Sequence, residues 1–147
     1  TNDGNFSNRI VHPSYNIAKE YYVLTKDKIC DELVDAFIKG IKINDIKYKA
    51  LNIDKKSDNS VIIKLNEGKK REIREVFSYY KIKIKELKRI AIGSLRLDDL
   101  KIRPGEYMHY SYEEIIKKIF DEKFWFFFIF IIYYTFKFYK RIEWISQ

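Results

Sequence analysis

The sequence predicts an α+β domain, in which strands and amphipathic helices alternate along the chain. Three observations indicate this class. Residues 19–24 and 61–65 are mostly apolar stretches of strand length, whereas residues 28–39 have the three-to-four-residue apolar period of a helix. A second helical period follows the strand at 61–65, and no internal repeat is visible. A chain of 147 residues can bury one modest core, so one domain with a tail is expected.

The first strand is predicted at residues 19–24, where the two-residue period of a strand places Tyr21 and Tyr22 on opposite faces. A helix is expected next, from about residue 28 to residue 39. Asp27 is available as its N-cap, and Gly40 is a suitable stop.

Two strands are predicted around the turn residues Asn44 and Asp45, at positions 41–43 and 47–53. Residues 54–60 are polar throughout, so a loop is expected there. The strand at 61–65 follows this loop.

A basic helix is predicted directly after the glycine turn at Gly68. Its apolar residues recur at i, i+3, i+4 and i+7: Ile73, Val76, Phe77 and Tyr80. Lys70, Arg71 and Arg74 then cluster on and beside the other face of its first turns. Free backbone N–H groups after Gly68 would add partial positive charge, which favours an anion such as a phosphate or carboxylate. On composition alone, a solvated basic helix face is the common alternative.

The last predicted elements are two strands and a short helix. Residues 81–85 and 87–92 alternate apolar and charged residues, and Gly93 marks a turn. Ser111 and Glu114 have the spacing of a capping box, which opens the final helix.

Charge and cysteine content limit the classes of partner. The formal net charge of +8 and pI of about 9.4 favour a polyanion, with an affinity that falls as salt rises. Cys30 is the one cysteine, so an internal disulfide is excluded, and it is expected to pack beside the apolar stripe of its helix. With His12 and His109 as the two histidines, no metal-ligand cluster of recognised spacing exists. We expect neither a metal nor another cofactor.

The order of segments resembles the RsuA/RluB branch of the RNA pseudouridine synthases. Five landmarks carry the resemblance in sequence: Thr1-Asn2-Asp3-Gly4, His12-Pro13, Lys19-Glu20-Tyr21, Glu67-Gly68-Lys69-Lys70-Arg71-Glu72-Ile73-Arg74, and Arg89-Ile90-Ala91-Ile92-Gly93 with Leu97 and Leu100. The resemblance implies a mixed, largely antiparallel sheet flanked by helices. It assigns residues 1–120 to the C-terminal part of the catalytic domain, and 121–147 to a tail outside the family.

The same resemblance implies a fragment. Met108 is the one methionine, so Thr1 is not a translation start. In the family, the segment that Thr1 opens closely follows a Gly-Arg-Leu-Asp motif with the catalytic aspartate, and this motif is absent here. Asp3 is interpreted as a structural turn residue and not as a substitute nucleophile. We therefore expect this chain to be inactive by itself.

Site residues follow from the resemblance. Tyr21 matches the residue that packs on the flipped uracil and can assist proton removal, and a buried strand aromatic is compatible with that role. Arg74 matches the arginine that pairs with the catalytic aspartate, the alternative being an exposed helix arginine. RNA contact or pocket packing is implied for a further set: Lys19, Leu65, Gly68, Lys69, Lys70 and Arg71. Glu75 departs from the family, where a basic residue usually stands.

The tail changes character at residues 124–134, an unbroken run of aromatic and β-branched residues. Three interpretations compete: an interfacial membrane segment flanked by Lys137, Lys140 and Arg141, an aggregation-prone strand, and translation past a frameshift in A/T-rich DNA. The frameshift is preferred. The run is shorter than the roughly 20 residues of a spanning helix, so membrane contact through 124–141 is the less favoured interpretation.

Two functions stay open. The first is an RNA pseudouridine synthase that acts without a cofactor on ribosomal RNA, in the bacterial cytoplasm or an organelle, with no obligate protein partner. The second is an inactive remnant that at most binds RNA through its basic surface.

Overall fold

The computed structural model describes residues 1–66, 68, 69 and 71–120. The chain divides after Pro104 into two units, Thr1–Pro104 and Gly105–Gln147, which are described separately. The hydrophobic run at 124–134 and the residues Glu67 and Lys70 lie outside the described residues.

The first unit opens with two short helical elements, α1 (Gly4–Val11) and the 3-10 helix η1 (Pro13–Tyr15). Asp3 is the N-cap of α1, because its Oδ1 accepts hydrogen bonds from the N–H groups of Asn5 at 2.9 Å and Phe6 at 3.0 Å. The structural interpretation of Asp3 is confirmed, although the sequence analysis predicted a turn and no helix here.

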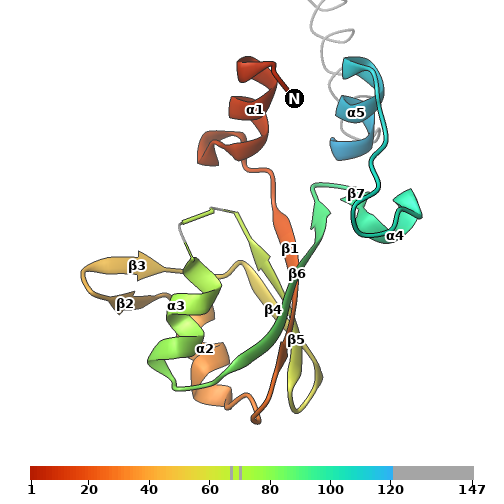
Figure 1. Cartoon of the computed structure of the whole chain (residues 1–147). Helices are drawn as coiled ribbons and strands as arrows, with labels where there is room; N and C mark the ends of the chain where they lie inside the picture. Colours follow the sequence, from red (N-terminus) through yellow and green to blue (C-terminus); the bar gives the residue numbers. More distant parts are fainter. Residues whose placement is uncertain (67, 70, 121–147) are drawn as a thin grey trace, which may run out of the picture. The chain divides into compact units, whose positions relative to one another are not determined.

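A five-stranded sheet forms the centre of this unit, in the order β4-β5-β1-β6-β7 (Figure 1). Every neighbouring pair is antiparallel. The strands are β1 (Lys19–Thr25), β4 (Asn52–Ser57), β5 (Ser60–Leu65), β6 (Ile84–Ile92) and β7 (Leu95–Arg96). The predicted strands at 19–24 and 61–65 are confirmed, and β1 is the central strand.

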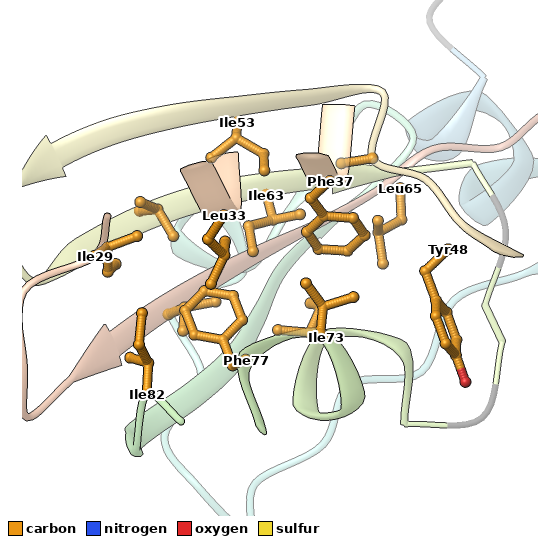
Figure 2. Packing of buried hydrophobic residues seen from close by; sticks show 14 residues of the cluster. Ile29, Leu33, Phe37, Tyr48, Ile53, Ile63, Leu65, Ile73, Phe77 and Ile82 are labelled. Carbon is orange, nitrogen blue, oxygen red and sulfur yellow. The ribbon is translucent and has the colours of Figure 1, made fainter. Parts of the chain in front are cut away.

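Two helices, α2 (Asp31–Lys39) and α3 (Glu72–Tyr79), cover one face of this sheet (Figure 1). Figure 2 shows Leu33 of α2 beside Phe77 of α3, and Phe37 of α2 near Ile63 of the sheet. Leu33, Phe37, Ile63 and Phe77 are all fully buried. The predicted apolar stripe of α3 therefore faces the core.

The start of α2 differs from the prediction. The helix begins at Asp31 after Cys30, and Asp27 is not its cap. The reason is nonlocal: Thr25 Oγ1 donates to the carbonyl of Asp27 at 2.7 Å and lies 3.0 Å from the carbonyl of Asn59, which holds this segment to the β4–β5 turn. Cys30 packs against the core cluster, as expected.

The segment from 41 to 57 was only partly predicted. A separate two-stranded sheet forms from β2 (Ile41–Ile43) and β3 (Ile46–Tyr48) around the predicted Asn44-Asp45 turn. The strand expected at 47–53 is instead divided between β3 and β4. The loop expected at 54–60 was wrong, because β4 continues to Ser57. It is an edge strand whose residues are mostly exposed, so polar side chains are tolerated.

After α3, the structure has one long strand where the sequence suggested two. β6 runs without interruption from Ile84 to Ile92, and Gly93 makes the predicted turn into β7. A short helix that was not predicted, α4 (Leu97–Leu100), follows.

The described part of the second unit contains α5 (Tyr112–Ile119). Its capping box is confirmed: Ser111 Oγ accepts from the N–H of Glu114 at 3.2 Å, and Glu114 Oε2 accepts from the N–H of Ser111 at 2.9 Å.

Candidate functional site

Tyr21 lies near the start of the central strand, on the face that α2 and α3 cover. Its register partners are Ile63 on β5 and Arg89 on β6, and residues directly opposite each other share a face. Tyr21 is half-buried and packs against the core cluster. The ring is thus fixed by its own strand and by packing.

Lys19 lies two residues before Tyr21 on the same strand face, between Leu65 and Ile92 of the neighbouring strands. The side chain is 5% exposed, and Leu65 is 2% exposed. Within the described residues, the Lys19 ammonium has no hydrogen-bond partner. Burial, and then the nearby charge of Arg89, lower the pKa of Lys19 below its ordinary value.

The opposite sheet face carries a different charge arrangement. Glu20 there accepts from Arg96 at 3.1 Å and lies 3.5 Å from the ammonium of Lys64. Arg96 opens an Arg96-Leu97-Asp98 triplet, which shares three letters with the Gly-Arg-Leu-Asp motif but lacks its glycine. Because Arg96 forms an ion pair with Glu20, the triplet starts on the sheet face opposite to Tyr21.

Asn66, Lys69 and Arg71, which lie between β5 and α3 in the sequence, each make a polar contact. Asn66 Nδ2 donates to Asn16 Oδ1 at 2.7 Å, and Lys69 Nζ donates to the carbonyl of Lys47 at 2.7 Å. Arg71 adopts the left-handed conformation with φ of 58°, and its Nε lies 3.3 Å from Glu75 Oε1.

The anion site expected at the N–H groups after Gly68 is not formed as predicted. The helix begins at Glu72, four residues later, so Arg71 precedes it and does not lie on its first turn. The first turn also carries the carboxylates of Glu72 and Glu75, which already match the positive end of the helix dipole.

Glu72 is a buried residue to which the sequence analysis gave no role. It is 3% exposed, and its Oε1 accepts from the N–H of Lys49 at 3.3 Å. This bond attaches the start of α3 to the chain that leaves β3. Because a glutamate in the first turn of a helix is common, no local sequence signal indicates its burial.

No family model matches the chain. It is 41% identical over 101 residues to an uncharacterized RNA pseudouridine synthase of Borreliella burgdorferi, a match that spans 69% of this chain and 41% of the relative. It is 34% identical over 106 residues to the ribosomal large subunit pseudouridine synthase B of Bacillus subtilis, and 30% identical over 119 residues to the ribosomal small subunit pseudouridine synthase A of Vibrio vulnificus. These two matches span 68% and 78% of this chain, and 43% and 51% of the relatives.

A crystal structure of a pseudouridylate synthase matches with a TM-score of 0.71 and 27% identity, over 81% of this chain and 52% of the other. This chain is related to the RsuA/RluB-type pseudouridine synthases. The predicted fold of this chain, an antiparallel sheet with flanking helices, is therefore confirmed. The chain spans about half the length of the relatives that it matches.

The structure brings together only some of the site residues that the pseudouridine synthase resemblance implied. Lys19, Tyr21 and Leu65 share one sheet face, on adjacent strands. Arg74 has an exposed side chain on α3, and Lys69 extends toward β3. The roles of these residues in a pseudouridine synthase stay predictions.

No group of three or more His, Cys, Asp or Glu side chains in the described part of this pseudouridine synthase relative could hold a metal ion. Among the same residues, no helix has the length and apolar character needed to cross a membrane.

Proposed function

We propose that this chain is part of an RNA pseudouridine synthase that converts a specific uridine of ribosomal RNA to pseudouridine. The observation that carries the proposal is the position of Tyr21, which is half-buried on the central strand of the sheet. The relatives of this chain are pseudouridine synthases. The names of the Bacillus subtilis and Vibrio vulnificus relatives refer to ribosomal subunits, which supports ribosomal RNA as the substrate class.

The chemistry explains why a fixed aromatic ring is useful here. The N-glycosidic bond of the uridine must break, the base must rotate, and a C–C bond must form. The target nucleotide therefore leaves its stack and enters a pocket. Tyr21 is suited to hold the uracil, because its ring face is apolar and its hydroxyl can exchange a proton.

Arg74 is proposed to pair with the catalytic aspartate. A carboxylate in a closed pocket needs a fixed cation to stay ionised, and the exposed guanidinium of Arg74 is available for such a partner. The Gly-Arg-Leu-Asp motif is not in this sequence, so we propose that this chain by itself does not convert uridine.

RNA contacts are proposed for Lys19, which lies on the same sheet face as Tyr21. They are also proposed for four residues that follow β5 in the sequence: Gly68, Lys69, Lys70 and Arg71. The net charge of +8 would add a general attraction to RNA. Bacterial relatives are consistent with action in a bacterial cytoplasm.

The second candidate is an inactive remnant that binds RNA through its basic surface. The same +8 charge favours it. An assay of pseudouridine formation separates the two candidates only when the parent transcript is known. The transcript should therefore be sequenced on both sides of the segment that encodes this chain. An in-frame Gly-Arg-Leu-Asp motif before Thr1 would favour the enzyme, and a stop codon or frame break there would favour the remnant.

The direct test compares Tyr21→Ala with Tyr22→Ala. The two tyrosines are adjacent in β1 but lie on opposite faces, so the second variant controls for loss of an aromatic ring. Tyr21→Ala should weaken binding of bacterial ribosomal RNA transcripts in a filter assay by roughly fivefold or more, because a stacked base contributes about 1–3 kcal/mol. Tyr22→Ala should change the affinity by less than about twofold.

Two results would contradict the proposal. Equal losses of RNA affinity in Tyr21→Ala and Tyr22→Ala would show that Tyr21 has no specific role in RNA binding. Pseudouridine formed in the transcripts by this chain without any added segment would show that its nucleophile lies within the chain.

Retention of RNA affinity after deletion of residues 124–147 would argue against a membrane role for the tail.

A further inference from the structure

Arg89 shares the sheet face of Tyr21 and Lys19, although its strand lies far along the sequence from theirs. It is directly opposite Tyr21 in the β1–β6 register. Lys19 stands two residues earlier on β1 and is therefore a diagonal neighbour of Arg89. Such neighbours lie about 7–8 Å apart, a span that two long side chains can close around one anion.

A register shift occurs at this point of the β1–β6 pair. Glu20 is opposite Ala91, but Tyr21 is opposite Arg89, so Ile90 is the extra residue of a bulge. Bulges bend a strand locally and can redirect a side chain. This bulge sets the position of Arg89 beside Tyr21, where a regular ladder would place Ile90.

The two faces of the sheet differ in how their cations are neutralised. On the opposite face, Glu20 contacts both Lys64 and Arg96. On the face of Tyr21, the Lys19 ammonium has no hydrogen-bond partner among the described residues, and no ion pair joins Arg89 to a described carboxylate. Two positive charges are thus placed near each other without a carboxylate between them.

This arrangement is unfavourable until an anion is bound. The Lys19 side chain is 5% exposed, and a buried charge without a partner is costly. Burial and the charge of Arg89 both lower the pKa of Lys19, which shows the same cost in the protonation equilibrium. Arg89 is exposed and can meet a ligand first. The flexible four-carbon stem of Lys19 then allows its ammonium to turn toward the same ligand.

We propose that Lys19 and Arg89 together bind one backbone phosphate of the RNA, next to the base that Tyr21 holds. The inference rests on the proposed function for the identity of the anion. Phosphate fits both cations, because the arginine fork can bind two of its oxygens while the lysine ammonium contacts a third. The site would fix the backbone while the base leaves its stack.

The experiment compares Arg89→Gln with Lys88→Gln in the full chain. Both residues are exposed, both substitutions remove one positive charge, and the neighbours on β6 lie on opposite faces. The first probe is inorganic phosphate, followed by amide shifts of residues 19–21 and 88–90 in NMR spectra. The second probe is a single-stranded oligouridylate, with its dissociation constant measured across a range of salt concentrations.

Arg89→Gln should weaken oligouridylate binding about tenfold and lower the salt slope by about 0.7, the value for one phosphate on a single strand. Lys88→Gln should change the dissociation constant by less than about twofold. Phosphate should shift the amides around Lys19 in the original chain but not in Arg89→Gln. Lys19→Gln should weaken RNA binding as Arg89→Gln does, and the exposed Arg89 keeps the test valid if Lys19→Gln folds poorly.

Equal losses in Arg89→Gln and Lys88→Gln would overturn the inference and leave only a general basic field. An absence of phosphate-induced shifts at residues 19–21 would overturn it as well. The proposed function can fail separately. If Arg89→Gln loses phosphate and RNA affinity while Tyr21→Ala binds RNA normally, the phosphate site stands and the uracil-holding role of Tyr21 does not.

Discussion

Replacing Lys19 by methionine should stabilise the chain in the absence of RNA. The substitution keeps an unbranched side chain of similar length but removes an ammonium that is buried and has no hydrogen-bond partner within the described residues. An unsatisfied buried donor costs about 1–3 kcal/mol, so the free energy of unfolding should rise by about this amount. Since 1 kcal/mol corresponds to roughly 2–8 °C, the Tm should rise by several degrees.

The assay is urea unfolding followed by circular dichroism, with Lys88→Met as the control. Lys88 is exposed, so its replacement should change the free energy of unfolding by no more than about 0.5 kcal/mol. The same Lys19→Met variant should bind oligouridylate more weakly than the original chain. Higher stability together with weaker binding is the pattern expected of a binding residue.

The stabilisation by Lys19→Met should shrink as the pH rises. The pKa of Lys19 is lowered in the fold, whereas an unfolded lysine has a pKa of about 10.4. Between these two values the unfolded state binds more protons, so the original chain gains stability with rising pH. Lys19→Met lacks this gain. A variant less stable than the original chain by 1 kcal/mol or more at pH 7 would refute the reasoning, because it would mean that the ammonium is favourably paired.

Three further predictions concern the scaffold. Phe77→Ala should lower the free energy of unfolding by about 3–5 kcal/mol in urea titrations, because Phe77 is fully buried between the helices and the sheet; a loss below 1 kcal/mol would contradict this packing. Gly40→Ala should destabilise by about 1 kcal/mol or more, since φ is +102°, a conformation that residues with a Cβ rarely adopt; unchanged stability would argue against this conformation. Ser111→Ala should reduce the helicity of α5 by removing a cap worth about 1 kcal/mol, which NMR shifts of residues 112–119 can measure against Ser94→Ala; equal spectra would mean that the cap is not needed.

The sequence predicted best those elements whose apolar pattern is also their packing pattern. β5 and the stripe of α3 are buried on the expected residues, so local periodicity and burial agree. β4 was missed because it is an edge strand with polar side chains, and its pairing with β5 cannot be seen in its own residues. The predicted start of α2 was too early. The hydrogen bond of Thr25 that holds this segment goes to Asn59, which lies 34 positions away in the sequence.

The candidate site shows the same division. The position of Tyr21 on β1 was predicted from the two-residue period of a strand. The resemblance to pseudouridine synthases was predicted from the order of the motifs. Arg89 stood in a recognised landmark, but its place opposite Tyr21 depends on a bulge between distant segments. The burial of Glu72 likewise depends on Lys49, which lies 23 positions earlier.

The hydrogen bonds that join the β2–β3 hairpin and Lys49 to Lys69 and Glu72 have a consequence for local unfolding. A two-stranded hairpin is marginally stable in isolation, and this one is held by Lys69 at the carbonyl of Lys47 and by Glu72 at the N–H of Lys49. The hairpin and the start of α3 should therefore open together, as one cooperative unit, at a lower free energy than the five-stranded sheet. A ligand that stabilises the start of α3 would then slow hydrogen exchange in the hairpin without contacting it.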